Sequence, residues 1–172
     1  DVALAVMRNT VVNMKRLMGN IDDIQARGNL MWDSAMAENG ILKVGRVTDF
    51  QCHQMEHQLG AYTDCNHGQG LAMIHPAYYR HIFRDGLDKF GRFAANVWMI
   101  PREKKSREEL AAAGLDALEA FIRELGLPTS LRQLGVRDKK QLPVIAGSCH
   151  FSPGGYRKMM PEEILEILQE CF

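Results

Sequence analysis

Apolar residues recur at helical spacing through most of this 172-residue sequence, and this pattern constrains the fold more than any other feature. Between residues 2 and 18, and again between 110 and 125, they follow an i, i+3, i+4 order that places them on one face of a helix. We find no stretch of useful length in which apolar and polar residues alternate, as they would along a half-buried strand. The pattern therefore predicts an all-α fold.

Local signals mark where the individual helices should begin and end. Asp22 or Asp23 should begin a helix to about Asn39 whose inward residues are Ile24, Leu30, Met31, Ala35 and Met36. Capping boxes at Thr48–Gln51 and at Ser106–Glu109 should start a helix through His53 and a helix to Leu125, and Pro161 should start the last helix. His67–Gly70 should open another helix, which continues from Leu71 to about Phe83 and is interrupted or kinked at Pro76. Residues 152–155 are predicted to form a loop.

Size and charge limit the class of the protein and its partners. A chain of this length can bury one core, so we expect a single domain that covers residues 1–172. Zero net charge and scattered basic residues indicate neither nucleic acid nor an anionic membrane surface as a partner. No apolar stretch approaches the roughly 20 residues that span a bilayer. Four cysteines without a CxxC pair favour reduced thiols and a cytoplasmic location.

The sequence CHQMEHQLGAYTDCNHGQG, residues 52–70, concentrates the chemistry of the chain, and we call it the histidine segment. His53 and His57 are four residues apart and share a helix face, while His67 follows a turn from which it can reach back. Histidine is the commonest metal ligand, so converging histidines predict a metal site. Gly68 and Gly70 permit close backbone approach to such a site. Solvated histidines on a polar helix face remain the competing interpretation.

The same segment admits two further interpretations. His53, Glu56 and His57 match the H-x-x-E-H pattern of a zinc protease, with Glu56 as general base and Glu119 or Glu124 as a third ligand, but three fixed positions often arise by chance. Cysteine thiolates can also bind zinc. Two cysteines of the segment and one later histidine are better explained by packing in the core: Cys52, Cys65 and His75.

Three stretches together carry a resemblance to a known family. ARGNLMWDSAMAENGIL, CHQMEHQLGAYTDCNHGQGLAMIHP and FGRFAANVWMI resemble the iron-containing alcohol dehydrogenases, and within them the butanol dehydrogenase branch. FIRELGLPTSLRQLGV and MMPEEILEILQECF extend the resemblance over essentially all 172 residues. It implies the helical C-terminal domain of the dehydroquinate synthase-like fold. In intact members an N-terminal α/β domain binds NAD(P), and the metal, usually Fe²⁺ and otherwise Zn²⁺ or another divalent ion, lies in the cleft between the domains.

The resemblance also implies roles for the three histidines. In the family an Asp and a His four residues later bind the metal with two further histidines, from an H-x-x-x-H…H-G pattern that falls here on His53 and His67. His57 is then no ligand but faces nicotinamide and substrate, as a cofactor contact and a proton relay. Residues 1–50 contain no histidine and no glycine-rich phosphate loop, and the helical pattern begins directly after Asp1 without a signal peptide. We therefore expect a C-terminal domain whose N-terminal α/β domain is absent.

By resemblance, the intact enzyme would interconvert small primary alcohols and aldehydes with NAD(P)H, which the absent domain would mainly bind. We expect the chain alone to be inactive and to self-associate or pair with an N-terminal domain. One alternative is a non-enzymatic metal-binding or interaction module that pairs with a separately encoded N-terminal half. The zinc protease is the weaker alternative.

Overall fold

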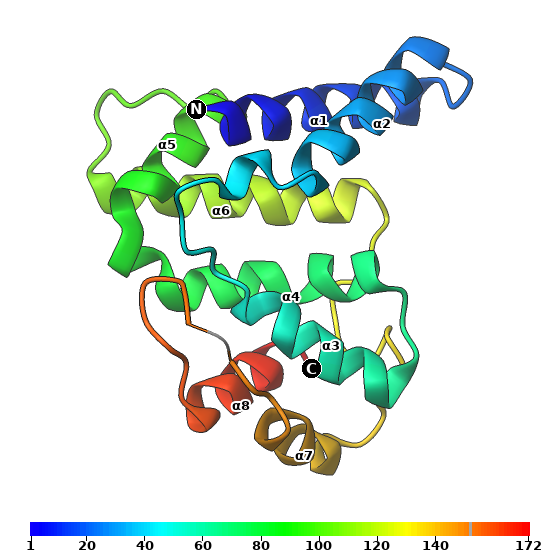
Figure 1. The fold of residues 1–172 in the computed structure, drawn as a ribbon, viewed down its shortest axis with the longest axis vertical. Helices are drawn as coiled ribbons and strands as arrows, with labels where there is room; N and C mark the ends of the chain where they lie inside the picture. The colour runs from blue at the N-terminus through cyan, green and yellow to red at the C-terminus, as the bar shows by residue number, and fades with distance from the viewer. Residues whose placement is uncertain (152) are drawn as a thin grey trace. The chain divides into compact units, whose positions relative to one another are not determined.

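The structure is a computed structural model that describes residues 1–151 and 153–172, and Figure 1 shows its ribbon. Every regular element of these residues is helical, which confirms the all-α prediction. The α-helices are α1 (Val2–Gly19), α2 (Ile24–Glu38), α3 (Gln51–Thr63), α4 (His67–Ile82), α5 (Leu87–Val97), α6 (Arg107–Glu124), α7 (Leu142–Gly147) and α8 (Pro161–Glu170). Short 3-10 turns are η1 (Ile41–Lys43), η2 (Phe83–Gly86) and η3 (Lys139–Gln141). The predicted loop 152–155 begins at Ser152, which lies outside the described residues.

The chain forms two compact units. The first unit contains Asp1–Arg46 and Leu87–Gly114, and the second contains Val47–Gly86 and Leu115–Phe172. Two such units can belong to one folding domain, so the expectation of a single domain over 1–172 stays a prediction.

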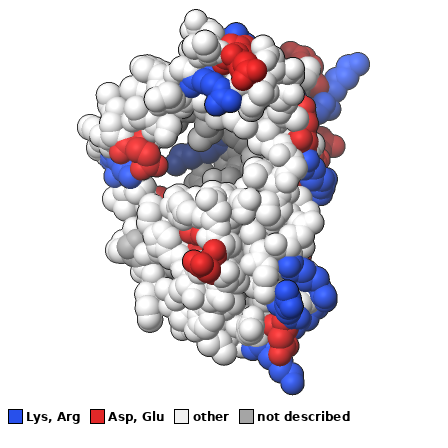
Figure 2. All heavy atoms as spheres, turned by 90° about the vertical axis from the view of Figure 1, so that its right-hand side faces the viewer, with Lys and Arg blue, Asp and Glu red and all other residues white. Residues whose placement is uncertain are grey.

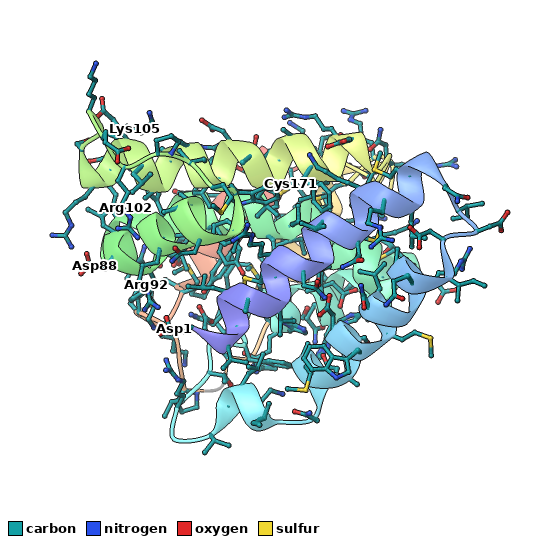
Figure 3. All side chains as sticks on the ribbon, turned by 90° about the horizontal axis from the view of Figure 1, so that it is seen from above. Asp1, Asp88, Arg92, Arg102, Lys105 and Cys171 are labelled. Atoms are coloured by element: carbon teal, nitrogen blue, oxygen red, sulfur yellow. The ribbon has the colours of Figure 1, made fainter. Side chains whose placement is uncertain are left out.

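In the first unit, α1 packs on α2 through a polar seam. The buried carboxylate of Asp33 accepts hydrogen bonds from Asn9 Nδ2 at 2.9 Å and from Thr10 Oγ1 at 3.0 Å. Asn13, which is also buried, accepts from Asn29 Nδ2 at 3.0 Å. Hydrogen bonding offsets the desolvation of these groups, and the seam sets the register of the two helices. Figure 3 shows Asp1, at the start of the unit, beside its ion-pair partner Arg92 of α5.

Helices α5 and α6 approach closely within the first unit. A Cβ added to Gly114 would lie 2.8 Å from Cβ of Ala94, so α6 needs glycine where it crosses α5. The predicted capping box at the start of α6 is confirmed, because Ser106 N donates to Glu109 Oε2 at 2.7 Å and Glu109 N donates to Ser106 Oγ at 3.1 Å. Asp23 caps α2 as expected, accepting from Ala26 N at 2.9 Å.

The second unit contains the histidine segment and an apolar core. Helix α3 packs on α4 and α7, while α4 packs on α8, and Figure 1 shows α3 and α4 side by side. Its fully buried side chains include apolar residues of these helices and the segments around them: Met55, Leu59, Ile74, Leu115, Leu131, Ile145, Ile167 and Leu168. This packing holds the two helices that carry the three histidines.

Three expectations were wrong in detail. Helix α3 begins at Gln51, and its N-cap residue is Phe50 rather than Thr48, so the Thr48–Gln51 capping box does not form. Asp49 Oδ1 instead accepts a hydrogen bond from Gln51 N at 3.0 Å. Helix α4 begins at His67 as expected, but it is not interrupted at Pro76, because the loss of one backbone donor does not end a helix that packs on its neighbours. Ile24, Met31 and Ala35 were expected to face inward but are exposed, the first two at 84% and 75%.

Charge on the surface is mixed. Figure 2 shows basic and acidic side chains near one another on one face, with broad areas that carry neither. This distribution agrees with the net charge of zero. Among the described residues, no helix combines the length and the hydropathy that crossing a membrane requires.

Candidate metal centre

The start of α3 is held by the buried side chain of Gln51. Its Nε2 donates to the Arg157 carbonyl at 2.8 Å and to Tyr78 Oη at 3.3 Å, and its Oε1 accepts from Met159 N at 2.7 Å. Tyr78 also donates to Asp49 Oδ2 at 2.5 Å. These bonds tie the first turn of α3 to α4 and to the segment before α8, and thereby fix where His53 lies.

A tight turn between α3 and α4 brings His67 back toward α3. Asp64 ends α3 in the left-handed region at φ 54°, which Asp and Asn adopt more readily than most residues. Asn66 then caps α4, because its Oδ1 accepts from Gln69 N at 3.2 Å. His67 is therefore the first residue of α4.

The three histidines of the segment lie close together. The ring centroid of His67 is 5.5 Å from that of His53 and 5.6 Å from that of His57, and the centroids of His53 and His57 are 6.3 Å apart. Phe50 stacks on the His53 ring at 4.3 Å and 15°, which orients it. The predicted convergence of these histidines is thus present in the structure.

The residues whose possible ligand atoms come together are not the three histidines but two of them and a glutamate. Among the described residues, ligand atoms of Glu56, His57 and His67 all lie within 4.8 Å of one another. The Glu56 carboxylate is buried and bonds to Nδ1 of His67, whereas His57 and His67 are exposed. The assignment of His53 and His67 as ligands and of His57 as relay stays a prediction. The sequence predicted that Glu56 shares a helix face with His53 and His57, but it indicated a role for Glu56 only as the general base of a protease.

The protease interpretation fits the structure poorly. A general base must reach a water beside the metal, but Glu56 is 2% exposed and its carboxylate bonds to His67. Of the suggested third ligands, Glu119 accepts from Arg80 Nε at 2.5 Å and also pairs with Arg123. These contacts occupy Glu56 and Glu119, two of the groups that the protease would use.

Cys52 and His75 behave as core groups, whereas Cys65, which was expected in the core, is only partly buried. Cys52 is buried, and burial raises the pKa of its thiol, so it stays protonated. Nδ1 of His75 donates to the Leu71 carbonyl at 2.9 Å, and burial lowers the pKa of His75 to about 4. His75 is thus the hydrogen-bonded, neutral histidine that the sequence predicts. His81 has a partner that the sequence did not reveal, since its Nε2 lies 3.2 Å from Glu163 Oε1.

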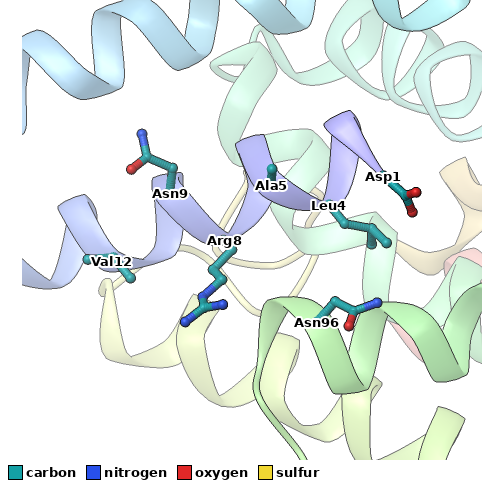
Figure 4. Close-up of a pocket in the computed structure, with 7 residues that line it drawn as sticks. All are labelled: Asp1, Leu4, Ala5, Arg8, Asn9, Val12 and Asn96. Carbon is teal, nitrogen blue, oxygen red and sulfur yellow. The ribbon is translucent and has the colours of Figure 1, made fainter.

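A pocket of about 470 Å³ lies in the first unit, along α1 and against Asn96 of α5. Figure 4 shows its lining, which includes Arg8 and Asn9. The lining residues that the structure describes include no histidine or cysteine, so this pocket offers none of the nitrogen or sulfur ligands of a transition-metal site.

Comparison with known proteins identifies the family of this chain. The sequence model of the Fe-containing alcohol dehydrogenase family, C-terminal, matches residues 1–172. The chain belongs to this family. NADH-dependent butanol dehydrogenase A of Clostridium acetobutylicum is 35% identical over 99% of this chain, and butanol dehydrogenase B of the same organism is 37% identical over 86%. The family resemblance seen in the sequence is confirmed.

The family likeness extends to three dimensions. The crystal structure of NADH-dependent butanol dehydrogenase A from Thermotoga maritima is similar over 99% of this chain, with a TM-score of 0.89 and 30% identity. The chain spans 45% of that protein and 45% and 38% of the two Clostridium relatives. The helical fold of iron-containing alcohol dehydrogenases is therefore shown for this chain.

The residues present fit the metal that the family name implies. Neutral imidazole suits iron and zinc alike. Nδ1 of His67 is turned to Glu56, which leaves Nε2 as its available nitrogen. The described residues before the histidine segment contain no histidine, so they supply no further imidazole.

Proposed function

We propose that this chain is the metal-holding part of an NAD(P)-linked alcohol dehydrogenase that interconverts small primary alcohols and aldehydes. One observation carries the proposal: the imidazoles of His53, His57 and His67 converge where α3 meets α4, in a chain of the Fe-containing alcohol dehydrogenase family. The butanol dehydrogenase names of its relatives support this substrate class.

Each histidine has a distinct role in this proposal. His53 and His67 would hold Fe²⁺, or Zn²⁺ or another divalent ion, through neutral ring nitrogens. When bound, the ion supplies Lewis-acid polarisation of the substrate oxygen. His57 is exposed and adjoins both other rings, so its ring nitrogens can pass a proton between solvent and the substrate hydroxyl, and it would face the nicotinamide.

Metal binding by the purified 172-residue chain tests the ligand assignment. We expect His53→Ala and His67→Ala each to weaken Co²⁺ binding by at least ~10-fold in calorimetric titration, and His57→Ala to change it by less than ~3-fold. The exposed His150 provides the matched control, His150→Ala. Loss of affinity on His57→Ala equal to that on His67→Ala would instead identify His57 as a ligand, in agreement with the proximity of donor atoms in Glu56, His57 and His67.

The chain alone is proposed to lack turnover. It spans less than half the length of its relatives, and we assign NAD(P)H binding mainly to an N-terminal α/β part. The test is reduction of butyraldehyde with NADH or NADPH after loading with Fe²⁺, followed by nicotinamide absorbance. Turnover at the rate of an intact relative contradicts this assignment.

A second candidate, a non-enzymatic module that pairs with a separate N-terminal half, has support from α2. Ile24, Met31 and Trp32 are 84%, 75% and 58% exposed, and the first two lie two turns apart on one helix face. Exposed apolar patches commonly mark interfaces. Light scattering should show self-association of the chain that Met31→Ser with Trp32→Ser abolishes. A wild-type chain that is monomeric at high concentration would count against this module.

A further inference from the structure

The carboxylate of Glu56 is buried within the second unit and directed at a histidine of the metal centre. Glu56 lies midway along α3 with its side chain 3% exposed, and its Oε2 bonds to Nδ1 of His67, the first residue of α4. A buried carboxylate is costly unless a donor satisfies it. The donor here is a ring whose other nitrogen, Nε2, can bind a metal.

Two glycines lie beside this carboxylate, and one of them provides its space. A Cβ added to Gly70, one turn along α4 from His67, would lie 2.8 Å from Cγ and Oε1 of Glu56. A Cβ added to Gly60, one turn along α3 from Glu56, would lie 3.6 Å from Oε1, which is an ordinary contact. Gly70 is therefore required for the position of Glu56, whereas Gly60 merely adjoins it.

We infer that Glu56 is a positioning residue that holds His67 as the tautomer with its proton on Nδ1 and its lone pair on Nε2. The inference rests on the proposed function in one respect, that the lone pair on Nε2 binds the metal. A carboxylate that accepts the second ring N–H of a ligating histidine fixes the ring orientation and raises the basicity of the ligand. A carboxylate in this place can instead bind the ion itself, because its oxygen lies within 4.8 Å of donor atoms of His57 and His67.

Substitution by glutamine separates these two roles. Glu56→Gln keeps an oxygen that accepts from Nδ1–H but removes the charge that a metal ligand needs, whereas Glu56→Ala removes both. The matched carboxylate control is Glu166→Ala, on the exposed face of α8. Circular dichroism of each variant checks that the helices are retained.

The first readout needs no metal. Long-range ¹⁵N–¹H spectra of the metal-free chain, at a pH where His67 is neutral, report which ring nitrogen carries its proton. We expect the Nδ1–H tautomer in the wild type, Glu56→Gln and Glu166→Ala, and a shift toward the Nε2–H tautomer in Glu56→Ala. An unchanged tautomer in Glu56→Ala overturns the inference.

The second readout is Co²⁺ affinity of the same variants. We expect Glu56→Ala to weaken binding by ~10- to 100-fold and Glu56→Gln by less than ~3-fold. Equal losses in both variants, with the tautomer of Glu56→Gln retained, identify Glu56 as a direct ligand and overturn the positioning role. If His53→Ala and His67→Ala leave Co²⁺ binding unchanged, the proposed metal site fails, while the tautomer spectra still decide the Glu56–His67 pairing.

A pair of glycine variants keeps the inference testable if Glu56→Ala does not fold. Gly70→Ala should displace the Glu56 side chain and shift the His67 tautomer as Glu56→Ala does. Gly60→Ala adds the same methyl group without a clash and should leave the tautomer unchanged. Identical spectra for these two variants contradict the inference.

Discussion

The helix pairs α1–α2 and α3–α4 are each two consecutive helices joined by a short turn, yet they distribute polarity in opposite ways. The α1–α2 pair buries Asn13 and Asp33 in its seam and leaves Ile24 and Met31 in solvent. The α3–α4 pair buries Met55, Leu59 and Ile74 completely and keeps two of its histidines at the surface. Helical periodicity is present in both, so periodicity alone does not determine which face of a helix is covered.

The two helix pairs differ in the interactions that stabilise them. In α3–α4 the burial of apolar area drives packing, and a few polar groups are fixed by specific bonds. In α1–α2 hydrogen bonds specify the register, while apolar side chains such as Met31 add little because water still reaches them. An outer apolar face of this kind is suited to cover by another chain or domain, as the second candidate function proposes.

Matched methionines give the largest expected effect. Met55 on α3 is fully buried and Met31 on α2 is 75% exposed. We expect Met55→Ala to lower the free energy of unfolding by about 2–5 kcal/mol, because it leaves a cavity. Met31→Ala should change it by less than ~0.5 kcal/mol. Urea unfolding followed by circular dichroism measures both, and equal losses would mean that the chain itself covers Met31 in solution.

Acid should destabilise the α3–α4 pair through His75. Burial lowers the pKa of this histidine to about 4 from the ordinary value of 6.5, so the folded state binds fewer protons than the unfolded state. Its contribution is complete above pH 6.5 and is lost as pH falls toward 4. The loss is on the order of 3 kcal/mol, at about 1.4 kcal/mol per pKa unit.

The variant His75→Gln tests this dependence. It should flatten the pH dependence of urea unfolding between these limits, with His150→Gln as the exposed control. Equal slopes for the wild type and His75→Gln would show that His75 is protonated in the folded state. Because residues 1–50 contain no histidine, α1–α2 should lack this sensitivity in hydrogen exchange.

The polar seam gives the smallest expected effect. Asp33→Ala leaves the amide of Asn9 without its acceptor, whereas the Thr10 hydroxyl keeps the Val6 carbonyl, and the loss should cost about 1–3 kcal/mol of unfolding free energy. Asp22→Ala, at an exposed carboxylate in the turn before α2, is the control and should cost less than ~0.5 kcal/mol. A seam variant that matches its control would remove the distinction between the two helix pairs.

Features set by neighbouring residues were predictable from the sequence. The Asp23 cap and the Ser106–Glu109 box involve atoms within three residues of one another, and both formed as predicted. Gln51 did not follow its local pattern, because its side chain bonds to the backbone of Arg157 and Met159 more than a hundred residues away. No local rule includes such partners.

The same limit applies to the candidate metal centre. The spacing of His53 and His57, with a turn before His67, was enough to predict that the three rings converge. The bond between Glu56 and His67 was not predictable, because it depends on how closely α4 approaches α3 at Gly70. Interhelical distance is a property of packing and has no direct signature in spacing.

The close approach of α5 and α6 has a consequence for how this sequence can vary. A Cβ at position 114 would lie 2.8 Å from Cβ of Ala94 and 3.0 Å from its backbone Cα, so replacing Ala94 by glycine would leave the backbone contact in place. A larger residue at position 114 therefore requires the two helices to move apart. Relatives that keep this helix crossing should retain glycine at the position of Gly114, whereas the position of Ala94 can vary between alanine and glycine.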